Sequence, residues 1–125
     1  MNKIKINIWG RDFELGLEYD CYSNEVILPT QKKAVEMIIA NKKCIEDSLS
    51  AVKNYCMNNN NGELKEKVIN NIFKYVIPKY LYVKRDDNKR VVAIMCNYKF
   101  DMENGMAIVF ENEEFVTIGK QDIVL

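Results

Sequence analysis

The C-terminal third of the chain decides the fold, because it holds three short apolar runs separated by turns. These runs are Val91-Val92-Ala93-Ile94-Met95-Cys96, Met106-Ala107-Ile108-Val109-Phe110 and Glu114-Phe115-Val116-Thr117-Ile118-Gly119. Turn-forming residues separate them at Asp101–Gly105 and Glu111–Glu113, which is typical of a β-meander. The first two runs are apolar on both faces, so we expect them in the middle of a sheet that is covered on both sides.

The N-terminal residues predict a β-hairpin with one apolar face. Residues 3–9 read KIKINIW and residues 13–19 read FELGLEY, and both runs alternate apolar with polar side chains. Gly10-Arg11-Asp12 forms the turn between them. The alternation puts Trp9 on the polar face, where an exposed Trp can anchor a binding partner. Packing across the strand or over the sheet edge is the alternative role for this side chain.

The middle of the chain predicts helices. Apolar residues recur at helical spacing in three segments, and we expect a helix in each, the first with Thr30 as its N-cap and the last ending before Pro78. A further short strand follows at Tyr80–Val83. The residues that define the helices are Ala34, Val35, Ile38 and Ile39, then Ile45, Leu49, Val52 and Cys56, then Leu64, Val68, Ile69, Ile72, Phe73 and Val76.

This order of elements predicts the α+β class in a single domain, residues 1–125. An antiparallel sheet, made of the N-terminal hairpin and the C-terminal meander, packs against two or three central helices. The helices can cover only one face of the sheet. The other face needs the hairpin or another protein, and a hairpin that extends the same sheet would leave an apolar patch exposed. We therefore expect association through the sheet.

Composition excludes several chemistries. The 125 residues carry 18 basic and 18 acidic side chains and no His, so a Ser-His-Asp arrangement is excluded and nucleic acid is not an expected partner. The four cysteines, Cys21, Cys44, Cys56 and Cys96, lack metal-site spacing. They indicate reduced thiols in a cytoplasmic protein. We expect no metal, no cofactor, no leader segment and no membrane span.

The densest polar motif is Asp101-Met102-Glu103-Asn104-Gly105. As structure it predicts a tight loop in which Gly105 takes a positive φ, and Gly119 opens a second turn before Asp122. As chemistry, Asp101 and Glu103 with Asp122 could bind calcium or magnesium, or act as acid and base. The loop has fewer oxygen ligands in series than a calcium loop needs, so the structural interpretation is favoured.

The C-terminal pattern resembles a family of small bacterial domains of unknown function. The residues that carry the resemblance are Asp101-x-Glu103-x-Gly105-x-Ala107-Ile108-x-Phe110 and Ile118-Gly119-x-x-Asp122. Pro78 with Tyr80–Val83 and the Thr30-Gln31-Lys32 helix start are similar too. Asn104 stands where that family usually has His, which argues against acid–base work at this position.

The resemblance implies a small cytoplasmic bacterial protein and suggests immunity or partner binding. The sequence therefore favours a non-enzymatic protein-binding module, with Trp9, Asp101, Glu103, Asn104 and Asp122 as candidate binding residues. The partner would be another protein or a second copy of the chain. The alternatives are a small metal-dependent or acid–base enzyme that uses Asp101, Glu103 and Asp122, and a purely structural homodimer subunit.

Overall fold

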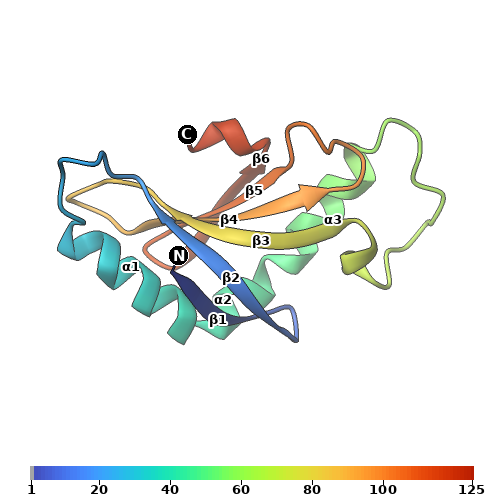
Figure 1. Ribbon diagram of the computed structural model, residues 1–125. Helices are drawn as coiled ribbons and strands as arrows, with labels where there is room; N and C mark the ends of the chain where they lie inside the picture. Colours follow the sequence, from blue (N-terminus) through green and yellow to red (C-terminus); the bar gives the residue numbers. More distant parts are fainter. Residues whose placement is uncertain (1) are drawn as a thin grey trace.

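The computed structural model describes residues 2–125 and confirms the α+β class (Figure 1). A single sheet of six strands has the order β1-β2-β3-β4-β5-β6. The strands are β1 (Lys3–Ile8), β2 (Arg11–Tyr19), β3 (Val76–Val83), β4 (Val91–Tyr98), β5 (Met106–Glu111) and β6 (Glu114–Gly119). Between β2 and β3 the chain forms the helices α1 (Pro29–Ala40), α2 (Lys42–Asp47) and α3 (Leu49–Asn58).

The hairpin of β1 and β2 extends the meander sheet instead of covering it. β2 pairs with β3 in parallel, with a register that runs from Gly16 opposite Tyr80 to Tyr19 opposite Val83. All other neighbouring strands are antiparallel. A parallel pair requires a long crossover connection, and the helical segment supplies it. The helices therefore lie on one face of the sheet, below it in Figure 1.

The main core lies between this face and the helices. Ile94 of β4, Leu81 of β3 and Ile8 of β1 are fully buried there with Ile38 and Ile45 from the helices. Helix α2 contacts both edge strands, β1 and β6. The sheet therefore curls around the helices, and its first and last strands meet the same short helix.

The segment that follows β6 covers part of the second face of the sheet. A short 3₁₀ helix, η2 (Gln121–Ile123), packs on β5 and lies above the sheet in Figure 1. Lys84 Nζ donates a hydrogen bond to the carbonyl oxygen of Val124 at 2.9 Å, which holds the C-terminal segment against the sheet. Met95 and Ala107 beneath are fully buried. The expectation that only the hairpin or another protein could cover this face is therefore wrong.

The predicted third helix, from Leu64 to about Ile77, is also wrong. Residues 59–71 contain no helix or strand, a 3₁₀ turn η1 (Ile72–Lys74) follows, and β3 then includes Pro78. Pro78 is tolerated in the strand because the β3–β4 register shifts between Pro78 and Tyr80, and such irregularities accept a residue without an N–H group. Ile69 and Ile72 are nevertheless buried. The spacing of the apolar residues therefore indicated burial of these two side chains, although they do not belong to an α-helix.

The start of α1 differs from prediction in its cap. The N-cap is Leu28, and Thr30 instead donates its hydroxyl to the carbonyl oxygen of Asp86 at 2.8 Å. Gln31 is almost fully buried, and its Oε1 accepts the Leu28 N–H at 2.9 Å. Its Nε2 donates to Asp20 and Val83 carbonyl oxygens at 3.0 and 3.2 Å. One buried amide therefore joins the helix start to the ends of β2 and β3.

Two further findings concern the whole described chain. Cys21, Cys44, Cys56 and Cys96 are all free, as the scattered spacing predicted. None of the helices within residues 2–125 has the length and apolar character that a membrane crossing requires.

Candidate functional site

The loop between β4 and β5 is organised by Asp101. Its Oδ1 accepts the backbone N–H of Asn104 at 3.1 Å, and Asn104 Nδ2 donates to both carboxylate oxygens at 3.2 and 3.0 Å. The Asn104 side chain and backbone, together with the charge of Lys120, lower the pKa of Asp101. Asp101 is therefore an ionised loop anchor whose oxygen atoms already have donors.

Gly105 takes the left-handed conformation that the sequence predicts, with φ of 62°. A Cβ atom here would lie 2.5 Å from Gln121 Nε2 and 2.8 Å from the carbonyl oxygen of Cys96. Gly119 is the last residue of β6, and a Cβ there would lie 3.0 Å from Ile123. Both glycines therefore let the segment after β6 approach the sheet closely.

A polar pocket of about 500 Å³ opens beside this loop. The Asn-rich segment Asn58–Asn61 lines it together with Asp101 and Lys120. Asn61 Nδ2 donates to the carbonyl oxygen of Phe100 at 3.0 Å. Tyr55 and Tyr98 also line it, together with Met57, Gly62 and Phe100, and burial raises the pKa of both tyrosine hydroxyl groups. The pocket thus presents amides, neutral hydroxyls and one pair of opposite charges.

Sequence reasoning missed this pocket, because it treated the Asn run only as loop composition. The sequence correctly predicted that Asp101 and Asn104 belong to one loop. The other two candidate carboxylates, Glu103 and Asp122, are both exposed. No group of three or more His, Cys, Asp or Glu side chains that could hold a metal ion occurs within residues 2–125.

Trp9 does not lie on the polar face, so that expectation is wrong. It stands in the β1–β2 turn with φ of 51° and only 9% of its surface is exposed. The positive φ takes it out of the strand alternation and turns the indole toward the helices. Its Nε1 donates to the carbonyl oxygen of Ile45 at 3.0 Å and to Ser48 Oγ at 3.3 Å. Trp9 therefore joins the hairpin to the α2–α3 junction.

An apolar groove of about 310 Å³ remains open where the second face of the sheet is not fully covered. We call it the C-terminal groove. Val91, Val109 and Val124 are the buried members of its lining. Val116 and Ile123 also line it, with 46% and 47% of their surfaces exposed. Thr117 and four charged side chains complete the lining, and the charged ones are Lys84, Asp86, Lys89 and Glu111.

An irregularity in β6 accounts for the exposure of Val116. Phe110 pairs with Phe115 and Val109 with Thr117, so Val116 is an extra residue in the strand. Such bulges disrupt the ladder and redirect a side chain. No motif in the sequence marks the bulge, and the run Glu114–Gly119 is simply read as a strand.

Comparison with known proteins identifies a family. The family model described as domain of unknown function DUF6985 matches residues 1–125. No curated protein and no solved structure matches the chain. The resemblance to a family of small domains of unknown function is therefore supported at the level of the family, over the whole sequence. The chain belongs to the DUF6985 family.

Proposed function

We propose that this domain is a non-enzymatic protein-binding module that contacts its partner through the C-terminal groove. The observation that carries the proposal is the half-exposed pair Val116 and Ile123 beside a buried apolar floor. Exposed apolar patches with a polar rim mark interaction sites. The charged residues at the groove supply such a rim, which would make the contact specific and fix the orientation of the partner.

The carboxylates argue for binding and against an enzyme. A general acid or base needs a pKa near the working pH and a free position beside the substrate. Asp101 has a lowered pKa and is engaged by Asn104, while Glu103 and Asp122 are exposed. The alternative, a small metal-dependent or acid–base enzyme, is favoured by the polar pocket beside Asp101 and Lys120. Calcium or magnesium binding that is abolished in Asp101→Asn would support it.

An immunity role is one form of this proposed function, and the resemblance to small bacterial domains suggests it. A cytoplasmic location accords with the four free cysteines. The partner would then be a foreign protein that the domain binds. A homodimer through the same groove is the other form, and solution mass distinguishes the two.

The test compares partner capture by wild-type protein and the Ile123→Glu variant, in lysate of the cells that express the domain. We expect the charged groove variant to lose the proteins that the wild type captures. Val68→Glu is the matched control, because Val68 is 69% exposed in the distant segment between α3 and β3. Equal capture by all three proteins would overturn the proposal. Light scattering that reports a dimer lost only in Ile123→Glu would assign the groove to a second copy.

A further inference from the structure

The outer edge of β1 is open. β1 is the first strand in the sheet order and pairs only with β2, and no other ribbon crosses in front of it in Figure 1. Leu17 N donates to the Asn2 carbonyl oxygen at 3.0 Å, and antiparallel pairs alternate between bonded and non-bonded positions. The backbone groups of Lys3, Lys5 and Asn7 therefore point away from β2. They form a template for another strand.

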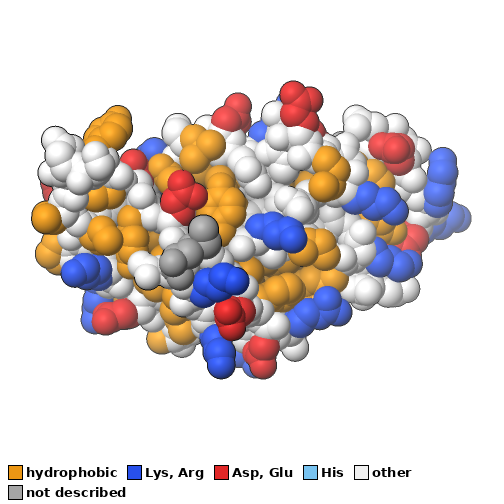
Figure 2. Space-filling model, in the orientation of Figure 1, with side chains coloured by type: hydrophobic (Ala, Val, Ile, Leu, Met, Phe, Trp, Pro, Cys, Tyr) orange, Lys and Arg blue, Asp and Glu red, His pale blue; other side chains and the backbone are white. Residues whose placement is uncertain are grey.

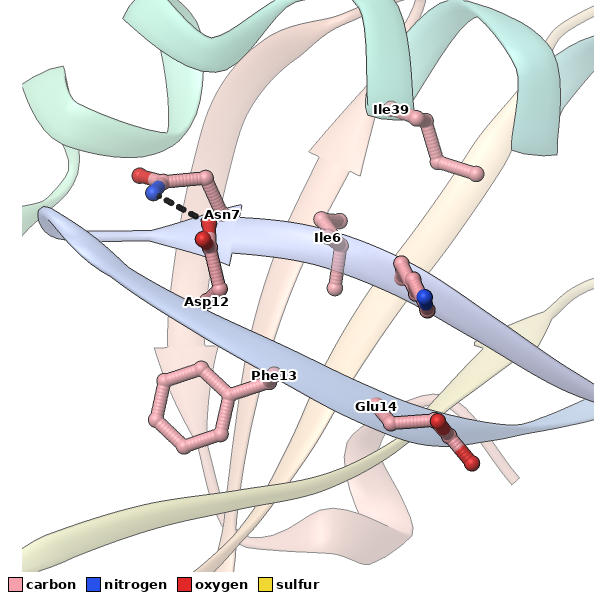
Figure 3. A pocket seen from close by; sticks show the side chains of 7 residues that line it. Ile6, Asn7, Asp12, Phe13, Glu14 and Ile39 are labelled. Carbon is pink, nitrogen blue, oxygen red and sulfur yellow. Dashed lines mark hydrogen bonds between the residues drawn. The ribbon is translucent and has the colours of Figure 1, made fainter.

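A recess adjoins this edge, and its apolar residues lie on the helix side of the sheet. Its polar lining is formed by Lys5, Asn7, Asp12 and Glu14. Figure 3 shows the side chain of Ile39 reaching from α1 toward strand β1, which carries Ile6, with Phe13 on the neighbouring strand. These residues line a pocket of about 510 Å³, and 37% of the Ile39 surface is exposed. A strand added to β1 would place alternate side chains on this face. Apolar side chains at those positions would cover Ile39.

The opposite face of β1 itself carries the basic side chains Lys3 and Lys5, while the neighbouring strand β2 places Asp12 and Glu14 on that same face. Lys3 and Lys5 are exposed, and within residues 2–125 neither forms an ion pair. Figure 2 shows Lys and Arg side chains interspersed with Asp, Glu and apolar ones on the side of the molecule that carries β1. Opposite charges on directly facing strand positions stabilise a sheet, and like charges destabilise it. The edge therefore favours acidic side chains at alternate positions of an incoming strand.

We propose that β1 binds an extended segment of another protein in which acidic and apolar residues alternate, as a seventh strand of the sheet. A second copy fits the edge poorly. Antiparallel pairing of two β1 strands about Lys5 would place Lys5 opposite Lys5, and edge lysines keep copies of a sheet apart. The other sheet edge, β6, is bulged at Val116. This β1 surface is separate from the C-terminal groove, so the binding proposal for one surface can be disproved while the other stands.

The test uses an eight-residue peptide of alternating Glu and Val, blocked at both ends, and amide NMR of the full chain. We expect the signals of Lys3, Lys5 and Asn7 to shift and their hydrogen exchange to slow by about tenfold or more. The same peptide with N-methyl groups on alternate residues lacks the donors for a ladder and should not bind. Equal binding of both peptides, no binding of either, or shifts confined to other residues would overturn the proposal.

Charge variants check the recognition. The double change Lys3→Glu and Lys5→Glu should weaken peptide binding by about tenfold or more. Lys65→Glu with Lys67→Glu is the matched control, because it makes the same charge change at the same spacing in exposed residues of the segment before β3. Equal loss in both double variants would overturn the specific role of β1. Concentration-dependent shifts of the β1 amides without peptide would show that a second copy occupies the edge instead.

Discussion

The indole nitrogen of Trp9 donates a hydrogen bond to the carbonyl oxygen of Ile45 at 3.0 Å, which ties the β1–β2 turn to the end of α2. The change Trp9→Phe keeps an aromatic ring but removes this bond. We expect a loss of about 1–2 kcal/mol in the free energy of unfolding. Ile45 keeps the hydroxyl of Ser48 as a donor, so no buried acceptor is left without a partner. Denaturant unfolding followed by circular dichroism measures the loss.

The fluorescence of Trp9 tests its burial independently. Trp9 is the only Trp in the chain, so wild-type fluorescence should be blue-shifted in the folded protein and shift to the red on unfolding. Emission that is typical of an exposed Trp in the native protein would contradict the burial, and an unchanged stability of Trp9→Phe would contradict the contact.

Gly105 and Gly10 separate the effect of backbone strain from that of crowding. Both have positive φ, 62° and 85°, so Ala should cost each about 1 kcal/mol. At Gly105 the added Cβ also meets Gln121 Nε2 at 2.5 Å and the Cys96 carbonyl oxygen at 2.8 Å, whereas at Gly10 it meets nothing within 4 Å. We therefore expect Gly105→Ala to be more destabilising, by about 1–3 kcal/mol. Thermal unfolding of the two variants provides the comparison, and equal melting temperatures would argue against the close approach.

Gln31 makes a third prediction possible because its amide is almost wholly buried. Gln31→Leu removes the acceptor of the Leu28 N–H and the donor to the Asp20 carbonyl oxygen. Unpaired buried polar groups are costly, and we expect a loss of about 2–4 kcal/mol in unfolding free energy. A melting temperature within a degree or so of wild type would show that water replaces the amide.

Gln31→Glu gives a sharper readout of the same contact. The introduced carboxylate would face two carbonyl oxygens, which disfavours its charged form and raises its pKa in the folded protein above the unfolded value. A raised pKa means that stability is lost as pH rises from about 4 toward 7. The variant should therefore be closest to wild type in acid. A constant difference between the two proteins across this range would contradict the proposed geometry.

Asp101 predicts the opposite dependence on pH. Its folded pKa is lowered by Asn104, so its contribution to stability is present above the unfolded pKa of about 3.9 and is lost as pH falls through the folded value. Asp101→Asn should be less stable than wild type at neutral pH, and the gap should close in strong acid. Glu103→Gln, which changes an exposed carboxylate in the same loop, is the control and should show no comparable gap. Melting temperatures measured from about pH 7 to about pH 2 test both variants.

Strand positions were predictable from the sequence because each strand has a local signature. The runs at 91–96, 106–110 and 114–119 alternate or stay apolar between turns, and they became β4, β5 and β6. The left-handed Gly105 was predictable for the same reason, since Asn-Gly in a short loop demands it. Nothing local distinguishes a helix from an irregular segment at Leu64–Val76, where Ile69 and Ile72 are buried without helix and Val68 is exposed.

The candidate site was less predictable because it depends on distant contacts. Trp9 changes face through its own backbone φ of 51°, which strand alternation does not reveal. The open β1 edge follows from the parallel pairing of β2 with β3, and the cover of the second face follows from η2 lying on β5. Each is a long-range arrangement that pattern and propensity leave undetermined.

The convergence of β1 and β6 on helix α2 has a consequence during protein synthesis. α2 leaves the ribosome long before β6, yet it contacts β6 as well as β1. Contacts between residues so distant in sequence form slowly, since a large loop must close first. The nascent chain should therefore expose the apolar side of α2 until β6 emerges, and this exposed surface makes it prone to aggregation during that interval.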